Sequence, residues 1–511
     1  MPDTIDQLVT RRAVEQGAKP MMIDPVSRLS YRELDTTTHD LAAAFIEAGI
    51  GKGTRVGLIM PNGVRWVEVA IALTRIGAVL VPLSTLLQAR ELAAQLRTAS
   101  VQFLISVEEF RGHRYLDDLQ REHLPALREV WTDDRLLPTA AGDPASRIVD
   151  VLAATVTPSD PMVVMFTSGS SGTPKGVVHS HGSALGAVAA GLTSRCIDSD
   201  TRLYLPMPFF WVGGFGSGVL SALVAGATLV TEAIPAPETT LRLLERERVT
   251  LFRGWPDQAE TLARHPYRAE ADLSALRPGS LEALLPREHR GKPGARATLF
   301  GMTETFGPYC GYPADIDMPE SAWGSCGKPF PGMEVRITNP DTGEPAPAGT
   351  IGMIELRGPH TLRGICRRSR EDLFTADGFY PTGDLGRLDD DGFLFYHGRS
   401  DDMFKVSGAT VYPTEVEQAL REIDGVDNAF VTNVSGAQGD QVGAVVVCDT
   451  AANTAEQLHG SARTLLSSFK VPTMWLLLDS DDAIPRGPTG KVDARQLRAL
   501  LSDSSHSSTA S

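Results

Sequence analysis

Two periods of apolar residues alternate along the N-terminal part of the chain, and each period predicts one kind of element. Residues 31–50 and 65–77 place apolar side chains every three or four positions, which is typical of amphipathic helices. Residues 55–60 and 78–83 are short, nearly continuous apolar runs, which favour buried strands. Helices that alternate with buried strands predict parallel strands joined by crossover helices.

The alternation of helix and strand patterns resumes beyond residue 182. It runs through residues 183–195, 201–207, 216–230 and 240–254. We therefore expect one large α/β body that continues to about residue 395.

The pattern changes between residues 323 and 395, where short strand patterns are separated by Gly-Pro and Asp-Gly turns. Such turns predict hairpins, and thus a β-subdomain attached to the α/β body. Helix and strand patterns then return over residues 414–423, 428–434, 441–448, 455–469 and 474–479. This last stretch predicts a small separate domain.

The predicted fold class is α/β, with a large N-terminal α/β body that contains parallel sheets plus a β-subdomain, and a small mobile α+β C-terminal domain. We place the N-terminal domain at residues 1–398 and the C-terminal domain at residues 399–505. The tail "SDSSHSSTAS" is small and polar and cannot bury apolar surface, so it is expected to be disordered, with residues 506–511 outside the C-terminal domain.

Composition and charge narrow the function classes. The formal net charge of −15 argues against general nucleic-acid binding, because neutralising phosphates needs a surplus of Lys and Arg. The five cysteines form no CxxC pair, which suits reduced thiols better than a disulfide framework or a zinc site. No apolar run has the length of a signal peptide or a membrane span. We expect a cytoplasmic protein.

The stretch "FTSGSSGTPKGV" follows the apolar residues 161–166 and precedes a helical pattern, so we place it on a strand-to-helix loop. Its glycines let backbone N–H groups approach an anion, and Lys175 adds a positive charge. It is not a Walker-type loop, because Pro174 precedes the lysine and Gly176 follows it. A flexible surface loop is the alternative on composition alone. The candidate phosphate-binding residues are Thr167, Ser168, Gly169, Ser170, Ser171, Gly172, Thr173 and Lys175.

Five stretches in this order resemble the motifs of the acyl-adenylate-forming ligases, the superfamily of acyl-CoA synthetases, luciferases and peptide-synthetase adenylation domains. "FTSGSSGTPKGVVHSH" resembles the family's phosphate loop and "LFGMTET" its ATP motif. "YPTGDLGRLDDDGF" resembles its ribose-binding strand, "GRSDDMFKVSGATVYPTEVE" its hinge and "IPRGPTGKVD" its C-terminal lysine loop. The resemblance covers nearly the whole chain between Leu29 and Leu500.

The resemblance implies roles for the ATP motif and the ribose-binding strand. Phe300 would lie against adenine, Thr303 would contact the α-phosphate, and Glu304 would hold Mg²⁺. A carboxylate beside a polyphosphate is tolerable when a divalent cation neutralises both. Asp384 would accept the ribose hydroxyls and Arg399 would contact ribose and phosphate. By themselves, these last two would be ordinary hairpin-turn residues.

The C-terminal motifs imply two alternating states. Lys491 resembles the lysine that stabilises the transition state of acid adenylation. The C-terminal domain would then rotate about a hinge at Asp401 and present Lys405 and Gly408 for thioester formation. A glycine suits the thiol tunnel, because a residue without Cβ lets pantetheine pass close to the backbone. With Thr303 and Glu304, the two lysines make up the candidate catalytic set.

The chain departs from the family in the wall of the acid pocket. Residues 276–299 lack the Gly-Gly-Ala-Pro-like loop, so its adenine and acyl contacts cannot be carried over. The candidate pocket residues are Trp211, which stands where relatives often have histidine, and Gly213. A bulky indole favours a compact or planar acid over a long alkyl chain, although a core aromatic is the other reading. The absence of an acid in "FFWVGGF" makes a free α-amino acid a less suitable substrate.

A local cluster of arginines stands out on this acidic chain. It comprises Arg363, Arg367, Arg368 and Arg370. The cluster could bind the phosphates of CoA or an acidic carrier protein. It could equally be a solvated loop balanced by Glu371 and Asp372.

The function that these features predict is an ATP-dependent carboxylic acid–CoA ligase. It would act through an acyl-adenylate with release of pyrophosphate, and would use ATP, Mg²⁺ and coenzyme A. The alternative is an adenylating enzyme that passes the activated group to a carrier-protein thiol, an amine or another small nucleophile. A nucleotide-binding protein without catalysis is a third reading, which the complete set of motif residues disfavours.

Overall fold

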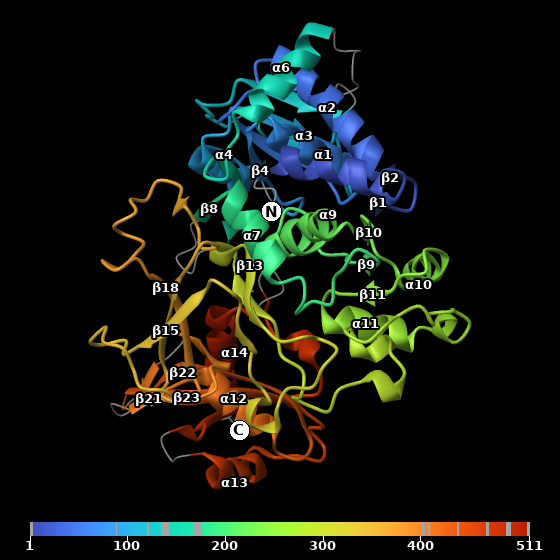
Figure 1. Ribbon diagram of the computed structural model, residues 1–511. Coiled ribbons are helices and arrows are strands. Elements are labelled where there is room, and N and C mark those ends of the chain that lie inside the picture. The colour runs from blue at the N-terminus through green and yellow to red at the C-terminus, as the bar shows by residue number, and fades with distance from the viewer. Residues whose placement is uncertain are drawn as a thin grey trace. The chain divides into compact units, whose positions relative to one another are not determined.

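The computed structural model describes most of the chain (Figure 1). It describes residues 4–87, 89–119, 122–133, 143–167, 175–400, 404–406, 409–436, 439–466, 470–486 and 492–507. The chain divides into two compact units. Unit 1 comprises Met1–Val335, Leu356–Tyr380 and Gly392–Leu394, and unit 2 comprises Arg336–Glu355, Pro381–Asp391 and Phe395–Ser511. The functional division at residues 398 and 399 stays a prediction.

Unit 1 contains a seven-stranded sheet of order β17-β8-β7-β4-β3-β5-β6. These strands are β17 (Gly364–Ile365), β8 (Lys175–Ser180), β7 (Pro161–Thr167), β4 (Val79–Pro82), β3 (Arg55–Ile59), β5 (Phe103–Ser106) and β6 (Glu129–Thr132). The strands from β7 to β6 are parallel to their neighbours, as the alternation of helix and strand patterns predicted. The helices of this region are α2 (Tyr31–Glu47), α3 (Val64–Arg75), α4 (Ala89–Ala99), α5 (Tyr115–Leu119) and α6 (Asp143–Ala154).

A second, five-stranded sheet of unit 1 has the order β11-β9-β10-β1-β2. Its strands are β11 (Leu251–Phe252), β9 (Arg202–Tyr204), β10 (Thr228–Val230), β1 (Pro20–Ile23) and β2 (Arg28–Ser30). All neighbours are parallel except β1 and β2. The helices that precede, connect or follow these strands are α1 (Ile5–Gln16), α7 (His181–Ala190), α8 (Val212–Gly214), α9 (Ser221–Ala225), α10 (Pro237–Arg246) and α11 (Pro256–Arg264), with a π-helical segment at Phe215–Leu220.

The region after α11 is irregular. Residues 276–299 contain only two short 3₁₀ turns, Glu282–Leu284 and Arg287–His289. A three-stranded sheet of β12 (Phe300–Met302), β13 (Gly307–Gly311) and β14 (Lys328–Pro329) follows. Residues 276–299, which depart from the family in sequence, therefore contain neither an α-helix nor a β-strand.

Unit 2 contains most of a four-stranded sheet of order β15-β16-β18-β19, which matches the predicted hairpin-rich region. Its strands are β15 (Glu334–Thr338), β16 (Gly352–Arg357), β18 (Tyr380–Leu388) and β19 (Leu394–Arg399). The C-terminal elements are β20 (Phe404–Val406), β21 (Ala409–Val411), α12 (Pro413–Arg421), β22 (Val426–Gly436), β23 (Gly439–Cys448), α13 (Ala455–Leu465), β24 (Met474–Leu478) and α14 (Ala494–Ser507). The helices and strands predicted after residue 408 are confirmed.

The expected disorder of the C-terminal tail is wrong for the residues up to Ser507, because α14 extends to that residue. Leu497 and Leu501 of this helix are buried, and the Asp493 carboxylate accepts backbone N–H groups from its first turn. A helix anchored in this way continues through the polar residues that follow. In the described part of the chain, no helix is long and apolar enough to cross a bilayer.

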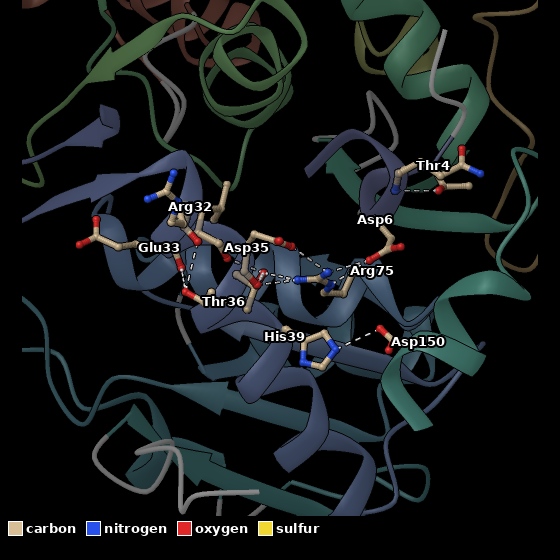
Figure 2. A network of polar contacts seen from close by, with 12 residues as sticks. Thr4, Asp6, Arg32, Glu33, Asp35, Thr36, His39, Arg75 and Asp150 are labelled. Carbon is tan, nitrogen blue, oxygen red and sulfur yellow. Dashed lines mark hydrogen bonds and ion pairs between the residues drawn. The ribbon is translucent and has the colours of Figure 1, made fainter. Parts of the chain in front are cut away.

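One buried charge ties the first three helices of unit 1 together (Figure 2). Arg75 at the end of α3 has a side chain that is only 3% exposed. Its guanidinium group lies 2.8 Å from the Asp6 carboxylate of α1 and 3.1 Å from the Asp35 carboxylate of α2. It also donates to Thr38 Oγ1 at 2.8 Å. A buried arginine is stable only with such partners, so the three helices are held in one arrangement.

Replacing this arginine should destabilise the protein much more than replacing an exposed one. We expect Arg75→Gln to lower the free energy of unfolding by about 2–4 kcal/mol, because two partly buried carboxylates lose their cation. The matched control is Arg11→Gln on α1, whose pair with Glu15 is exposed, and it should cost less than about 0.5 kcal/mol. Urea unfolding followed by circular dichroism measures both. Equal losses would contradict a structural role for Arg75.

Candidate functional site

Two antiparallel strands, β7 and β8, flank the Gly/Ser-rich stretch in the sequence. β7 ends at Thr167, β8 begins at Lys175, and these two residues face each other across the pair. Residues Ser168, Gly169, Ser170, Ser171, Gly172 and Thr173 lie outside the described part. The expected strand-to-helix loop is wrong, because β8 follows the loop and α7 begins only at His181. The run after Lys175 forms a strand because Val177 is buried and pairs with both β7 and β17.

The ATP-motif residues form a strand and a tight turn. Phe300 lies in β12, and a 3₁₀ turn of Thr303–Thr305 follows it. Glu304 is 7% exposed, and its backbone carbonyl accepts the N–H of Leu362 at 2.7 Å. The phenol of Tyr380 donates to Glu304 Oε1 at 3.3 Å. The carboxylate is therefore held in one place at the edge of the protein interior.

A buried histidine connects this turn to the hairpin. His179 of β8 is completely buried, and its Nε2 donates to the carbonyl of Thr303 at 2.8 Å. Its ring packs edge-on against Phe306, with ring centroids 5.0 Å apart. Burial lowers the pKa of His179 to about 4. The hydrogen bond to Thr303 raises this pKa, whereas the positive charge of Arg363 lowers it further. The neutral ring then carries its proton on Nε2, since a carbonyl can only accept.

The arrangement suits a polyphosphate with a divalent cation. Lys175 starts the same strand that contacts Thr303 through His179, so a cationic side chain and the Glu304 carboxylate belong to two adjoining segments. A carboxylate oxygen is the kind of ligand that Mg²⁺ takes, usually with waters and substrate phosphates completing the shell. No group of three or more His, Cys, Asp or Glu ready to bind a metal exists among the residues with described positions. A single protein carboxylate fits that mode of binding.

Two tryptophans stand at the carboxyl ends of neighbouring parallel strands. Trp211 follows β9 and caps α8, and Trp255 follows β11 and caps α11. Their rings meet edge to face, with centroids 6.0 Å apart. Ligands of α/β sheets bind at the carboxyl ends of the strands, so this aromatic pair lies where a substrate is expected. Gly213 of α8 is also close-packed, since a Cβ there would come within 2.7 Å of Met207 Sδ.

The ribose-motif residues come together in unit 2. Arg399 Nη1 lies 3.2 Å from Asp384 Oδ1 and donates to the carbonyl of Thr382 at 2.9 Å. Gly383 has a φ of 77°, and a Cβ there would lie 2.6 Å from Arg399 Nη2. Only glycine allows both this backbone conformation and the close approach of the guanidinium group.

The remaining C-terminal candidates are described only in part. Lys405 lies on β20, opposite Thr410 of β21. Asp401, Gly408 and Lys491 lie outside the described residues. Arg486 and Val492, on either side of the lysine loop, form an antiparallel bridge.

The arginine cluster of residues 363–370 is exposed. Arg370 stacks over the ring of Phe374 at 4.3 Å, and Arg367 donates to the carbonyl of Arg97. None of the four arginines forms an ion pair with Glu371, Asp372 or another residue whose position is described. The reading in which these two acids balance the cluster by direct pairing is therefore not supported.

Three residues of the site region were missed by reasoning from the sequence. They are His179, Tyr380 and Trp255. His179 falls in β8, a strand that was not predicted from the sequence, so its inward direction was not recognised. Trp255 carried a usable signal, because it follows a predicted strand end as Trp211 does.

Comparisons with known proteins give consistent matches. A family model described as "AMP-binding enzyme" matches residues 9–366. The chain is 33% identical to a 3-[(3aS,4S,7aS)-7a-methyl-1,5-dioxo-octahydro-1H-inden-4-yl]propanoyl:CoA ligase of Mycobacterium tuberculosis, over 98% of each chain. It is 30% identical to a feruloyl-CoA synthase of Amycolatopsis sp, over 92% of this chain and 93% of that one. Among solved structures, the amide bond synthetase McbA from Marinactinospora thermotolerans has a TM-score of 0.79 at 28% identity, covering 98% of this chain and 100% of that chain.

The buried histidines predict a loss of stability in mild acid. Burial lowers the pKa of both His179 and His181 from 6.5 to about 4. The unfolded chain therefore takes up protons below pH 6.5 that the folded chain does not bind until about pH 4. The contribution of the neutral histidines to the free energy of unfolding is complete above pH 6.5 and decreases as the pH falls towards 4. Below about pH 4 this contribution no longer changes. Each histidine should contribute a slope of about 1.4 kcal/mol per pH unit within this window.

Urea unfolding at about pH 7.5 and about pH 5.5 measures this loss. The variant His179→Gln keeps an N–H donor for the Thr303 carbonyl and removes one titrating group. It should reduce the difference between the two pH values by about 1.4 kcal/mol. An unchanged difference would show that His179 does not contribute to the acid sensitivity.

Proposed function

We propose that this chain, which belongs to the family of AMP-binding enzymes, is an ATP-dependent ligase that joins a carboxylic acid to coenzyme A through an acyl-adenylate. The observation that carries the proposal is the hydrogen bond from His179 to Thr303. It shows that the strand starting at Lys175 and the turn bearing Glu304, two motifs more than a hundred residues apart, adjoin in unit 1. The two segments must lie next to each other if one polyphosphate is to contact Lys175 and a cation held by Glu304.

In the first step, a carboxylate oxygen of the acid attacks the α-phosphorus of ATP, and the bond to the pyrophosphate oxygen breaks. The products are acyl-AMP and pyrophosphate. We infer that Lys175 and the loop that it ends bind the phosphates, that Thr303 contacts the α-phosphate, and that Phe300 lies against adenine. Glu304 would hold Mg²⁺, which neutralises charge on the phosphate oxygens when it is bound. Lys491 would stabilise the charge that develops on the phosphorus oxygens.

In the second step, the thiol of coenzyme A attacks the acyl carbonyl carbon and AMP leaves. Asp384 and Arg399 would hold the ribose during both steps, and their ion pair in unit 2, at 3.2 Å, supports a shared role. Lys405 and Gly408 would face the thiol after a rotation about Asp401. This assignment of the C-terminal residues rests on their motifs.

The aromatic pair favours an acid with a ring. Trp211 and Trp255 meet edge to face at the carboxyl ends of their strands, which offers flat apolar surfaces to a substrate. The relatives named above include a ligase for a bicyclic propanoate and a feruloyl-CoA synthase. We therefore propose a compact, ring-bearing carboxylic acid as the substrate class.

A different acceptor for the acyl group is the second candidate. The amide bond synthetase among the similar structures shows that an amine can be the acceptor in a protein of this fold. Both relatives named above, at 33% and 30% identity, carry names that specify CoA, which favours the thiol. The two acceptors differ in one measurable respect, the dependence of turnover on CoA.

The proposed function is tested by the release of pyrophosphate from ATP with a panel of acids, each with and without CoA. The panel contains aryl, bicyclic, short-chain, medium-chain and dicarboxylic acids. We expect repeated turnover with a ring-bearing acid, and only when CoA is present. Turnover that continues without CoA but requires an amine would overturn the CoA ligase in favour of an amide synthetase. If no acid caused pyrophosphate release although the protein still bound ATP, the proposal that it is a catalyst would be contradicted.

The phenol of Tyr380 should matter for Mg²⁺. We expect Tyr380→Phe to raise the Mg²⁺ concentration for half-maximal pyrophosphate release by about fivefold, because losing one hydrogen bond to a carboxylate costs about 1 kcal/mol. The control is Tyr115→Phe, which removes a buried phenol bonded to the Thr85 carbonyl at 2.9 Å. This control should leave the Mg²⁺ dependence unchanged. Equal shifts in the two variants would mean that Tyr380 acts through stability alone.

A further inference from the structure

A cavity lined by arginines lies beside the amino ends of β9 and β11 in the five-stranded sheet. Arg202 is the first residue of β9, and Thr250 immediately precedes β11. The cavity has a volume of about 700 Å³. Its lining residues are Arg28, Arg202, Arg246, Glu247, Arg248, Thr250 and Ala275. All of them belong to unit 1.

A single buried carboxylate organises the arginines. The side chain of Glu247 is 2% exposed, and its Oε1 lies 2.5 Å from Arg28 Nη2 and 2.9 Å from Arg246 Nε. Its Oε2 lies 3.1 Å from Arg202 Nη2. The guanidinium groups are therefore fixed by a common partner, and both oxygens of that partner are occupied.

The positive charge of the cavity exceeds what Glu247 can neutralise. The lining contains four arginines and one glutamate. Arg248 is exposed and forms no ion pair with any residue that the structure describes, although Asp272, outside the lining, interacts with it electrostatically. Arg28 and Arg246 each direct one nitrogen to Glu247, and their other guanidinium nitrogens have no partner in the described chain. Thr250 Oγ1 accepts the N–H of Arg202 at 2.9 Å, which leaves its hydroxyl hydrogen available to donate. The lining residues therefore carry a formal excess of three positive charges and have hydrogen-bond donors without partners among the described residues, which favours the binding of an anion.

The position separates this cavity from the proposed active site. β9 and β11 are parallel, and the chain continues from their carboxyl ends to Trp211 and Trp255. Arg202 and Thr250 stand at the opposite, amino ends of these two strands, and Arg246, Glu247 and Arg248 lie at the end of α10, just before β11. A ligand held here would not be the acid or the nucleotide of the reaction.

We propose that this cavity is a second ligand site and that it binds the phosphate group of a small molecule. A phosphate brings up to two negative charges and three oxygens, which match several guanidinium forks at once. A single carboxylate would leave most of the excess charge uncompensated. The volume lies within the range of small-molecule sites and exceeds what one phosphate needs, so the ligand is a phosphorylated molecule or a polyphosphate.

The test measures binding of inorganic pyrophosphate and of succinate by isothermal titration calorimetry, at constant ionic strength. The test variant is Arg246→Gln with Arg248→Gln, which leaves Arg28 and Arg202 on Glu247 and so keeps the buried carboxylate paired. The charge-matched control is Arg242→Gln with Arg264→Gln, which removes two exposed arginines from α10 and α11 outside the cavity. Arg248→Gln alone serves as a second, milder variant that breaks no ion pair.

We expect the Kd for pyrophosphate at this site to rise at least tenfold in the test variant and about threefold in Arg248→Gln, with no change in the control. Succinate should bind at least tenfold more weakly than pyrophosphate to the unaltered protein. Acid-dependent pyrophosphate release should persist in the test variant, because none of its residues belongs to the proposed active site. Equal pyrophosphate binding in all variants, an equal loss in the control, or equally tight succinate binding would each overturn the proposal.

Discussion

The turn that carries Thr303 and Glu304 depends on hydrogen bonds supplied by distant segments. It has three residues, too few to fix their own orientation, and it ends at Phe306 with a left-handed φ of 53°. His179 holds the carbonyl of Thr303, and the N–H of Leu362 holds that of Glu304. These donors come from β8 and from the segment before β17, so the turn reaches its geometry only when unit 1 is folded. Preorganisation of this kind is what electrostatic catalysis needs.

The same histidine connects the candidate site with the predicted acid sensitivity of unit 1. A protonated His179 could still donate to Thr303, so the hydrogen bond alone does not require a neutral ring. Desolvation and the nearby Arg363 favour the neutral ring and lower the pKa of His179, because burial disfavours a charged imidazolium and the positive charge of Arg363 repels it. A buried arginine is tolerated elsewhere in unit 1, at Arg75, because two carboxylates surround it. Arg75 and His179 are both buried, and they differ in whether carboxylates lie beside the charged group.

The sequence predicted the periodic elements and failed where tertiary pairing overrides local pattern. The elements of residues 31–83 and 183–254 and those after residue 408 follow from apolar spacing, and the ribose-motif pair of Asp384 and Arg399 follows from the motifs. β8 was missed because its six residues have no strong alternation, and only pairing with β7 and β17 makes them a strand. Tyr380 could not be connected with Glu304, since a contact over 76 positions leaves no local trace. The cluster around Glu247 was invisible for the same reason, because Arg28, Arg202 and Arg246 are far apart in the chain.

The acidity of the chain makes these local arrangements decisive. With a net charge of −15, the protein as a whole repels anions, yet the proposed reaction and the proposed second site both need them. Salt screens the distant acids beyond about 8–10 Å at physiological ionic strength, so the nearest side chains govern the affinity of each site. At the carboxyl edge the tryptophans offer apolar surface, whereas at the amino edge fixed guanidinium groups offer charge. The five-stranded sheet therefore separates the proposed acid site beside the tryptophans from the proposed phosphate site beside Glu247, so the two ligands do not compete for one pocket.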